Sequence, residues 1–260
     1  MARALCPGMD SGLYAAYTGL AARTQALDTA ANNLANAGTN GFRAQRDYFR
    51  GVLVEGLSPD SLAQSQVGET VNNFGILGGN VLDMGQGQLV TTGNPHDLAI
   101  QGSGFFAIQT SNGVRYTRDG GFTRSSTGVL QTSSGEAVLD AKLKPITIPS
   151  GEIRISPDGS ISVSGPDGGA LAGQVGLFDF ESRYSLIAEG VSRFAAGPDA
   201  KRKAADGSIQ QGALEGANQD AIHGTMQMVL VQRQAEMMQK ALSIFNNDFD
   251  KTATEELPRV

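Results

Sequence analysis

Both ends of this 260-residue chain repeat apolar residues at helical spacing, and a Gly-rich stretch separates the two patterns. In the N-terminal pattern, residues seven or four apart form one stripe: Leu13, Tyr17, Leu20, Thr24, Leu27, Ala31 and Leu34. This heptad-like spacing predicts an amphipathic helix that is capped by Asp10 or Ser11 and ends near Asn36. Gly38 is suited to be the left-handed residue that closes it. Interspersed alanines leave little bulk, so another helix could approach closely.

The C-terminal pattern alternates intervals of three and four residues, at Met228, Val231, Ala235, Met238, Leu242, Phe245 and Phe249. It predicts a second amphipathic helix, with Asn218 or Asp220 as its cap. Five more apolar residues are expected to broaden the same stripe: Met226, Leu230, Met237, Ala241 and Ile244. A stripe of that width exceeds what a two-stranded contact needs. We therefore expect this helix to touch more than one partner.

Between the two helical patterns, short apolar runs alternate with turn signals, as in Phe105–Ile108 before Ser111-Asn112-Gly113. Strict alternation in Ile153-Arg154-Ile155 and Ile161-Ser162-Val163 predicts strands with one face in a core and one in water. The predicted fold class is α+β, with long N- and C-terminal amphipathic helices pairing in a coiled-coil-like layer and a central, mostly antiparallel β domain. A helical hairpin packed on its own β domain is the alternative.

These patterns divide the chain into successive segments. Met9-Asp10-Ser11 resembles a translation start, so residues 1–8 are either an upstream extension or part of the native chain. The remaining expected segments are an N-terminal helix at 9–42, an extended arm at 43–96, the β domain at 97–200, a return segment at 201–217 and a C-terminal helix at 218–254.

Charge and cysteine content exclude several classes of function. The formal net charge is −6, with no long Lys/Arg cluster, which argues against nucleic-acid binding. Cys6 is the only cysteine, so there is no internal disulfide and no thiolate metal cage. No apolar run of eighteen residues occurs, so membrane insertion is not expected. The first thirty residues also lack the pattern of a cleaved secretory signal.

Motifs that suggest chemistry have plainer explanations. Gly102-Ser103-Gly104 lacks the third glycine and the following helix of a phosphate-binding loop, and fits a turn better. His96 and His223 are the only histidines, and neither has a recurring metal-ligand spacing to an acid or a cysteine. Phe105, Phe106, Phe122 and Phe178 are interpreted as β-domain core rather than a ligand platform. We assign no catalytic, cofactor-binding or metal-binding residue and expect no enzyme.

Three motifs resemble those of a known family. Residues Ala31–Phe42, with an Asn-rich helix end before Thr39-Asn40-Gly41-Phe42, look like the N-terminal signature of the flagellar rod and hook proteins. Asn94–Phe106, followed by Tyr116–Gly120, is similar to the family's entry into its β domain. Gln211–Asn218 resembles its approach to the C-terminal helix. The order and spacing agree along almost the whole chain from Met9.

The resemblance implies a structural subunit of the bacterial flagellar basal-body rod, which polymerises helically into the drive shaft for motility. Its partners would be other copies of itself, other rod proteins and the flagellar type III export apparatus. It would reach the rod, which crosses the periplasm, without a cleaved signal peptide. An adhesive or carbohydrate-binding β-domain protein is the second hypothesis, and a hydrolase is the third.

Within the family, three segments look most like the proximal rod member: Gly41–Gln45, Val54–Ser58 and Ile155–Ser162. The distal rod member is the alternative, and the hook protein ranks third. The helix stretch Met226–Gln234 lacks a Tyr that commonly follows Arg there. The residues expected to mediate assembly are the four leucines of the N-terminal stripe, the seven residues of the C-terminal stripe and six residues of the N-terminal motif: Leu13, Leu20, Leu27 and Leu34; Met228, Val231, Ala235, Met238, Leu242, Phe245 and Phe249; and Asn32, Asn33, Asn36, Thr39, Gly41 and Phe42.

Overall fold

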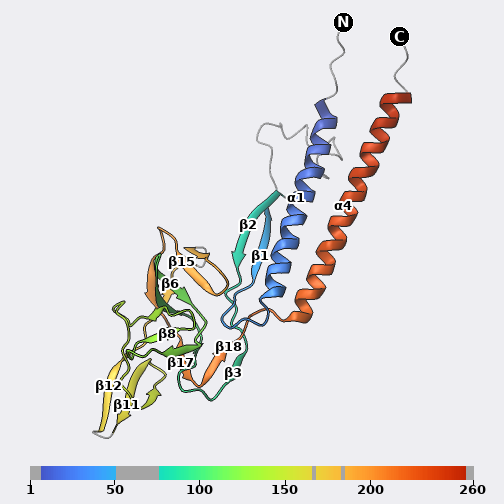
Figure 1. The fold of residues 1–260 in the computed structure, drawn as a ribbon. Coiled ribbons are helices and arrows are strands. Elements are labelled where there is room, and N and C mark those ends of the chain that lie inside the picture. The colour runs from blue at the N-terminus through green and yellow to red at the C-terminus, as the bar shows by residue number, and fades with distance from the viewer. Residues whose placement is uncertain (1–6, 51–75, 166–167, 183–184, 256–260) are drawn as a thin grey trace. The chain divides into compact units, whose positions relative to one another are not determined.

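The computed structural model describes residues 7–50, 76–165, 168–182 and 185–255. Figure 1 shows two long helices and a set of small sheets. The chain divides into two units. The helical unit comprises Met1–Asn32, Arg46–Val81 and Ile222–Val260, and the β unit comprises Asn33–Gln45 and Leu82–Ala221. Among the described residues, no helix is long and apolar enough to span a membrane.

The helical unit is built on α1, Pro7–Ala35, and α4, Ala221–Glu255. Helix α1 begins at Pro7, upstream of the predicted caps, because a proline loses no helical hydrogen bond at a first position. It ends at Ala35, and Gly38 was the wrong choice for the left-handed residue. That conformation falls to Gly41, at φ +67°. The paired strands β1, Gln45–Arg50, and β2, Ile76–Leu82, lie in the expected arm.

The largest sheet of the β unit is organised around one strand, β5, Phe105–Thr110. One edge of β5 pairs with β6, and the other edge is shared by β13 and β9. The order along the sheet is β14-β15-β6-β5-β9-β8-β7, and β16 pairs with β13. The other strands of this sheet are β6, Gly113–Thr117; β7, Phe122–Arg124; β8, Leu130–Thr132; β9, Ala137–Val138; β13, Leu177–Phe180; β14, Leu186–Ala188; β15, Arg193–Ala196; and β16, Arg202–Ala204.

Three smaller sheets complete the β unit. A three-stranded sheet has the order β10-β11-β12, and two pairs join β17 to β4 and β18 to β3. Their bounds are β3, Leu89–Thr91; β4, Leu98–Gln101; β10, Glu152–Ile155; β11, Ser160–Gly165; β12, Gly168–Gln174; β17, Ser208–Gln211; and β18, Ala213–Glu215. The β17–β4 and β18–β3 pairings are antiparallel, and β18 is the last strand before α4.

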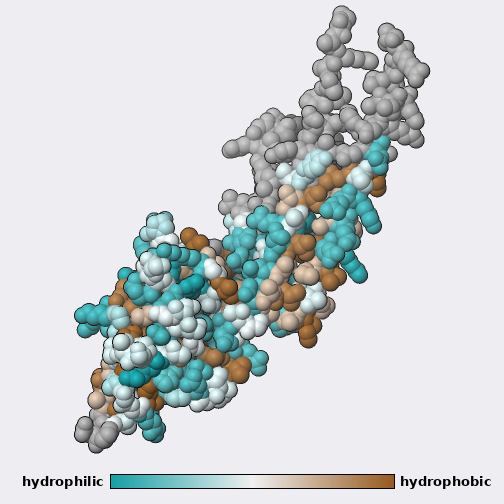
Figure 2. Space-filling view, in the orientation of Figure 1, coloured by the Kyte–Doolittle hydropathy of each residue, from teal (hydrophilic) through white to brown (hydrophobic). Residues whose placement is uncertain are grey.

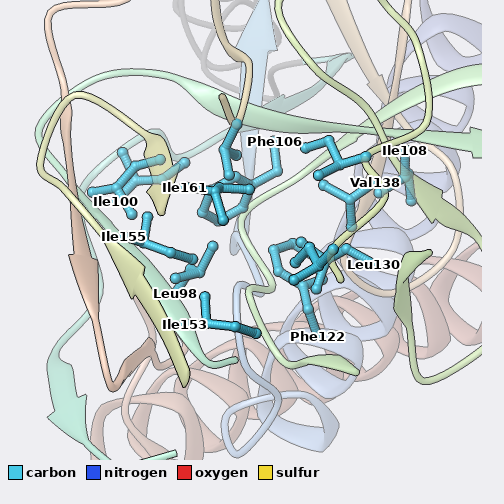
Figure 3. Packing of buried hydrophobic residues seen from close by; sticks show 14 of the residues in the cluster. Leu98, Ile100, Phe106, Ile108, Phe122, Leu130, Val138, Ile153, Ile155 and Ile161 are labelled. Carbon is cyan, nitrogen blue, oxygen red and sulfur yellow. The ribbon is translucent and has the colours of Figure 1, made fainter. Parts of the chain in front are cut away.

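Two apolar clusters fill the β unit, and β5 separates them. Phe106 and Ile108 belong to the larger cluster, whose packing is shown in Figure 3, whereas Phe105 and Ala107 belong to the smaller one. Neighbours along a strand point to opposite faces, so a continuous apolar run is what a strand buried on both sides requires. The ring centroids of Phe106 and Phe122 are 5.1 Å apart in an edge-to-face arrangement.

The coarse fold prediction is confirmed, because the structure is α+β with a mostly antiparallel β core and two helices. The predicted alternation is also present: Ile153, Ile155, Ile161 and Val163 are buried, whereas Arg154 is exposed. The four phenylalanines assigned to the core are all buried. Pairing of the two helices in a coiled-coil-like layer stays a prediction, and part of the expected arm, residues 51–75, lies outside the described residues.

Candidate assembly site

One side of α4 carries the stripe that the sequence singled out, here called the inner stripe: Met228, Val231, Ala235, Met238 and Leu242. Ala235 is 8% exposed and Leu242 is 5% exposed, and the other three are half-buried. Most of the remaining described side chains of α4 are exposed. The side chains of Phe245 and Phe249 lie outside the described residues. The inner stripe therefore marks the side of α4 that packs against protein.

A second set of apolar residues, here called the outer face, lies elsewhere on α4: Ile222, Met226, Leu230, Met237 and Ile244. They are between 57% and 74% exposed. At about 100° per residue, they fall on roughly the opposite side of the helix from the inner stripe. Sequence reasoning was wrong to expect Met226, Leu230, Met237 and Ile244 to broaden the stripe. Figure 2 shows hydrophobic surface recurring along the described part of the helices.

Helix α1 packs through small residues rather than through its leucines. Ala22, Ala26 and Ala30 are buried, with Thr29 and Asn33 beside them. The predicted leucines Leu20, Leu27 and Leu34 are half-buried, the side chain of Leu13 lies outside the described residues, and Tyr17, Thr24 and Ala31 are exposed. Alanine at the contact lets a neighbouring element approach the helix backbone closely.

A polar contact joins α1 to the strand pair of the helical unit. The Thr29 hydroxyl donates to Oδ1 of Asp47 on β1, at 3.0 Å, and Nδ2 of Asn80 on β2 donates to the same hydroxyl at 3.4 Å. Partial burial raises the pKa of Asp47, whereas the hydrogen bond from Thr29 acts to lower it. These contacts fix the strand pair against the C-terminal half of α1.

The β unit contains a buried group of three charged side chains and one glycine, which we call the junction: Gly41, Arg43, Arg118 and Glu215. Nη2 of Arg43 donates to Oε1 of Glu215 at 2.6 Å, and Nη1 of Arg118 donates to Oε2 at 3.1 Å. The three charged side chains are between 0% and 5% exposed. Burial lowers the pKa of Arg118, and the Arg43 charge acts the same way, while the Glu215 carboxylate opposes both.

The charge of Asp179 also acts to raise the pKa of Arg118, and neutral groups make its other contacts. Its Nη2 donates to the carbonyl of Gly102 at 2.8 Å, and its guanidinium carbon lies 5.1 Å from the ring centroid of Phe105. An arginine over an aromatic face is favourable when desolvated. Its Nε is buried without a hydrogen-bond partner. Arg118 is therefore held largely by neutral atoms, and Glu215 is the carboxylate that hydrogen-bonds it.

The backbone at the junction requires glycine. The amide of Gly41 donates to the backbone carbonyl of Glu215 at 2.7 Å. Gly41 has φ +67°, and a Cβ there would lie 2.2 Å from the backbone nitrogen of Asp119. Any other residue would clash with the backbone that carries Arg118. This close approach explains the Gly in the Thr-Asn-Gly-Phe motif.

Two asparagines connect segments of the β unit that are distant in sequence or separated by a turn. The Asn33 side chain both donates to the carbonyl of Gln45 and accepts from its amide, at 2.7 and 2.9 Å. The Asn218 side chain accepts from the amide of Ala44 at 2.8 Å and donates to the carbonyl of Asp83 at 2.8 Å. Asn218 therefore bonds the segment after α1 rather than capping α4.

The structure brings together part of the predicted motif. Asn33, Gly41 and Phe42 are buried at or beside the junction, Asn36 and Thr39 are half-buried in the turns between, and Asn32 is exposed. Sequence reasoning did not select Arg43, Arg118 or Glu215, although all three lie within or next to the family motifs, and it proposed Asn218 only as a helix cap. One charged residue within or directly after each of three separate motifs was the signal that could have found them.

The described residues hold no group of three or more His, Cys, Asp or Glu side chains that could bind a metal ion. The fold and the junction define a class of structural protein, in which the segments next to both terminal helices are fastened to one β unit.

Comparison with known proteins identifies the family. Residues 13–43 match the family described as flagella basal body rod protein, and residues 99–163 match the flagellar hook protein FlgE/F/G D1 domain. The flagellar basal-body rod protein FlgF of Mesorhizobium japonicum is 34% identical over 88% of this chain and 90% of its own length. FlgF of Salmonella typhimurium is 36% identical over 88% and 93%, and FlgG of Bacillus subtilis is 30% identical over 86% and 91%.

This chain belongs to the flagellar basal-body rod protein family, a family of structural proteins rather than enzymes. Nothing in these similarities favours an adhesive or carbohydrate-binding protein.

Proposed function

We propose that this chain is a subunit of the bacterial flagellar rod that polymerises helically, with other copies of itself and with other rod proteins, into the shaft that transmits torque. The observation that carries the proposal is that α4 has apolar residues on two sides. The inner stripe is buried or half-buried, but the five residues of the outer face are more than half exposed. Exposed apolar residues repeated along one face of a helix are typical of an interface.

Pairing of the terminal helices in a coiled-coil-like layer would explain why α4 has apolar residues on two sides. The small residues of α1, such as Ala22 and Ala26, would let helices pack closely, and α4 would contact one helix on each side. Head-to-tail contacts of this kind use two different surfaces of one subunit, so they need not close into a ring and can produce a helical filament. In that arrangement the helices form the inner layer of the tube and the β units lie outside.

Assembly in this form fits delivery of the chain in an unfolded state. A solitary helix owes most of its stability to burial of its apolar face, so the helices would become fully ordered as a subunit joins the growing end. We propose export through the flagellar type III apparatus without a cleaved signal, and a final position in the rod across the periplasm. The β unit differs from the helices, because its two apolar clusters are buried within one chain.

The proximal rod is the proposed position. Relatives named FlgF are 31% to 36% identical to this chain, and relatives named FlgG are 28% to 31% identical. The difference is modest, and both kinds of relative are matched along most of their length. The distal rod is therefore the alternative that an experiment must exclude.

Immunogold labelling of purified basal bodies tests this proposal. The chain would carry an epitope in the 51–75 segment, with wild-type motility as the control for the tag. Label on the proximal part of the rod is the expected result. Label confined to the distal part would replace the proximal position by the distal one, and basal bodies without label would refute a role in the rod.

A further inference from the structure

The junction contains more positively charged than negatively charged side chains. Two guanidinium groups, of Arg43 and Arg118, are hydrogen-bonded to one carboxylate, of Glu215, so these three side chains have one more positive than negative charge, and the charge of Asp179 also acts on Arg118. The three residues come from distant parts of the chain. Arg43 is 172 positions from Glu215, and Arg118 is 97 positions from it. Charges withdrawn from water need close partners, and here one late residue supplies the only carboxylate that hydrogen-bonds either arginine among the described residues.

Glu215 also accepts hydrogen bonds from two backbone amides near the junction. Its Oε1 accepts from the amide of Gly87 at 2.9 Å, and its backbone carbonyl accepts from the amide of Gly41. The strand that carries it, β18, pairs with β3. In a β unit in which β18 has not docked, burial of Arg43 would bring two like-charged side chains together without the Glu215 carboxylate, and the turn after α1 would lack the acceptor for the amide of Gly41.

We propose that Glu215 is an electrostatic latch that makes docking of β18 a prerequisite for fixing the segment after α1. Until Glu215 enters, repulsion between Arg43 and Arg118 keeps residues 39–44 from their buried position. When it enters, the same step fixes residues 213–218, which lead into α4. The two helix ends thus become attached together, and only in a chain whose β unit is complete up to β18. The latch operates within one subunit and does not depend on the proposed role in the rod.

The latch predicts a specific partly open state. The apolar clusters contain no part of residues 39–44 or of 213–218, so opening the junction leaves them in place. Local opening of this kind is measured by amide hydrogen exchange in the native protein. The alternative is that Glu215 is simply one more part of a single cooperative core, in which case its loss would affect all strands alike.

Hydrogen exchange by mass spectrometry on the full chain distinguishes the two. In E215Q, which keeps the side-chain shape but loses the charge, we expect exchange to accelerate by about tenfold or more in peptides covering 39–44 and 213–218, and to change by less than about twofold in β5 and β11. The amide of Gly87 is left out because it donates directly to the carboxylate. E152Q is the matched control, since the Glu152–Arg154 pair is about three-quarters exposed.

Two further variants test whether charge is the cause. R118M leaves a balanced Arg43–Glu215 pair, so its exchange in 39–44 and 213–218 should stay within about threefold of the wild type. The triple variant R43M/R118M/E215M removes all three charges with side chains of similar length and should restore the protection that E215Q loses. The latch is overturned if E215Q exchanges like the wild type, if its acceleration is equal in β5 and β11 or it fails to fold, if R118M is as open as E215Q, or if the triple variant is not restored.

Discussion

The β unit and α4 differ in how far their apolar residues are buried within one chain. In the β unit, aliphatic and aromatic residues from many strands are less than 10% exposed and form two clusters. On α4, only one side is covered, and the outer face leaves Ile222, Met226, Leu230, Met237 and Ile244 in contact with water. The two apolar clusters of the β unit are thus buried within one chain, whereas α4 has a row of apolar residues that one chain does not bury. Folding and assembly should therefore respond to different substitutions.

The largest expected effect is in the β unit. Phe106 is fully buried and packs edge-to-face on Phe122. Replacing it with alanine should destabilise this unit by about 3–5 kcal/mol, because a cavity remains in a packed cluster. Urea denaturation followed by near-ultraviolet circular dichroism measures it. The control is Leu171→Ala, a residue 76% exposed. Equal midpoints for the two variants would show that the cluster does not hold the β unit together.

The next effect concerns the inner stripe. Leu242→Asp places a charge where the side chain is 5% exposed, at a cost of a few kcal/mol to that contact, about 1–3. In a flagellated strain that lacks its own copy, the variant should abolish rod assembly and swimming. Ser243→Asp, at the adjacent exposed position, is the control and should swim. Normal motility of the Leu242 variant would remove this residue from the assembly contact.

The outer face should affect assembly without affecting the fold. Met237 is 62% exposed, so Met237→Lys should leave the stability of the chain unchanged within about 0.5 kcal/mol. Association should weaken about tenfold, equivalent to ~1.4 kcal/mol, if this side chain is buried between subunits. Swimming halos and the yield of intact rods give the readout, with Gln239→Lys as control. A variant that assembles like Gln239→Lys would leave the outer face without a role.

The smallest effect tests the electrostatics of the β unit. Burial raises the pKa of Asp119, the hydrogen bond from Gly121 lowers it, and the charge of Asp97 raises it. A carboxylate whose pKa is raised on folding adds stability below its unfolded pKa and loses it as the pH rises through the folded value. Asp119→Asn should therefore raise the melting temperature at pH 7, by about 2 °C, with a smaller gain at pH 3. A gain that increases as the pH falls would contradict this assignment.

The sequence predicted what depends on local spacing and missed what depends on distant pairing. Alternation in Ile153–Ile155 was visible because side-chain direction in a strand follows its two-residue period. The helical period likewise located the least exposed side of α4. Met226 and Leu230 were assigned to the wrong side, because residues one or two positions apart in sequence lie about 100° or 200° apart around the axis. Whether either side contacts a neighbouring subunit stays a prediction.

The junction could not be inferred in this way. Nothing in the local pattern around Arg43 indicates a partner 172 residues later. The assignment of Gly38 as the left-handed residue failed for the same reason, because the backbone of Asp119, which is distant in sequence, leaves no room for a Cβ at Gly41. Resemblance to a family selected the right motifs, but their chemistry required the three-dimensional contacts.

The chain enters and leaves the β unit at neighbouring points. The Asn218 side chain donates to the carbonyl of Asp83 at 2.8 Å, so the two ends of the longer segment of the β unit, Leu82–Ala221, lie close together, and this segment is topologically a single insertion. Insertions whose two ends lie close together are tolerated because their size does not alter the host segment. An exchange of everything from Leu89 to Leu214 for a longer or shorter outer domain would preserve the spacing between the two helices. If the helices form the inner layer of the rod, as proposed above, such an exchange would change the outside of the filament and leave the contacts between helices unchanged.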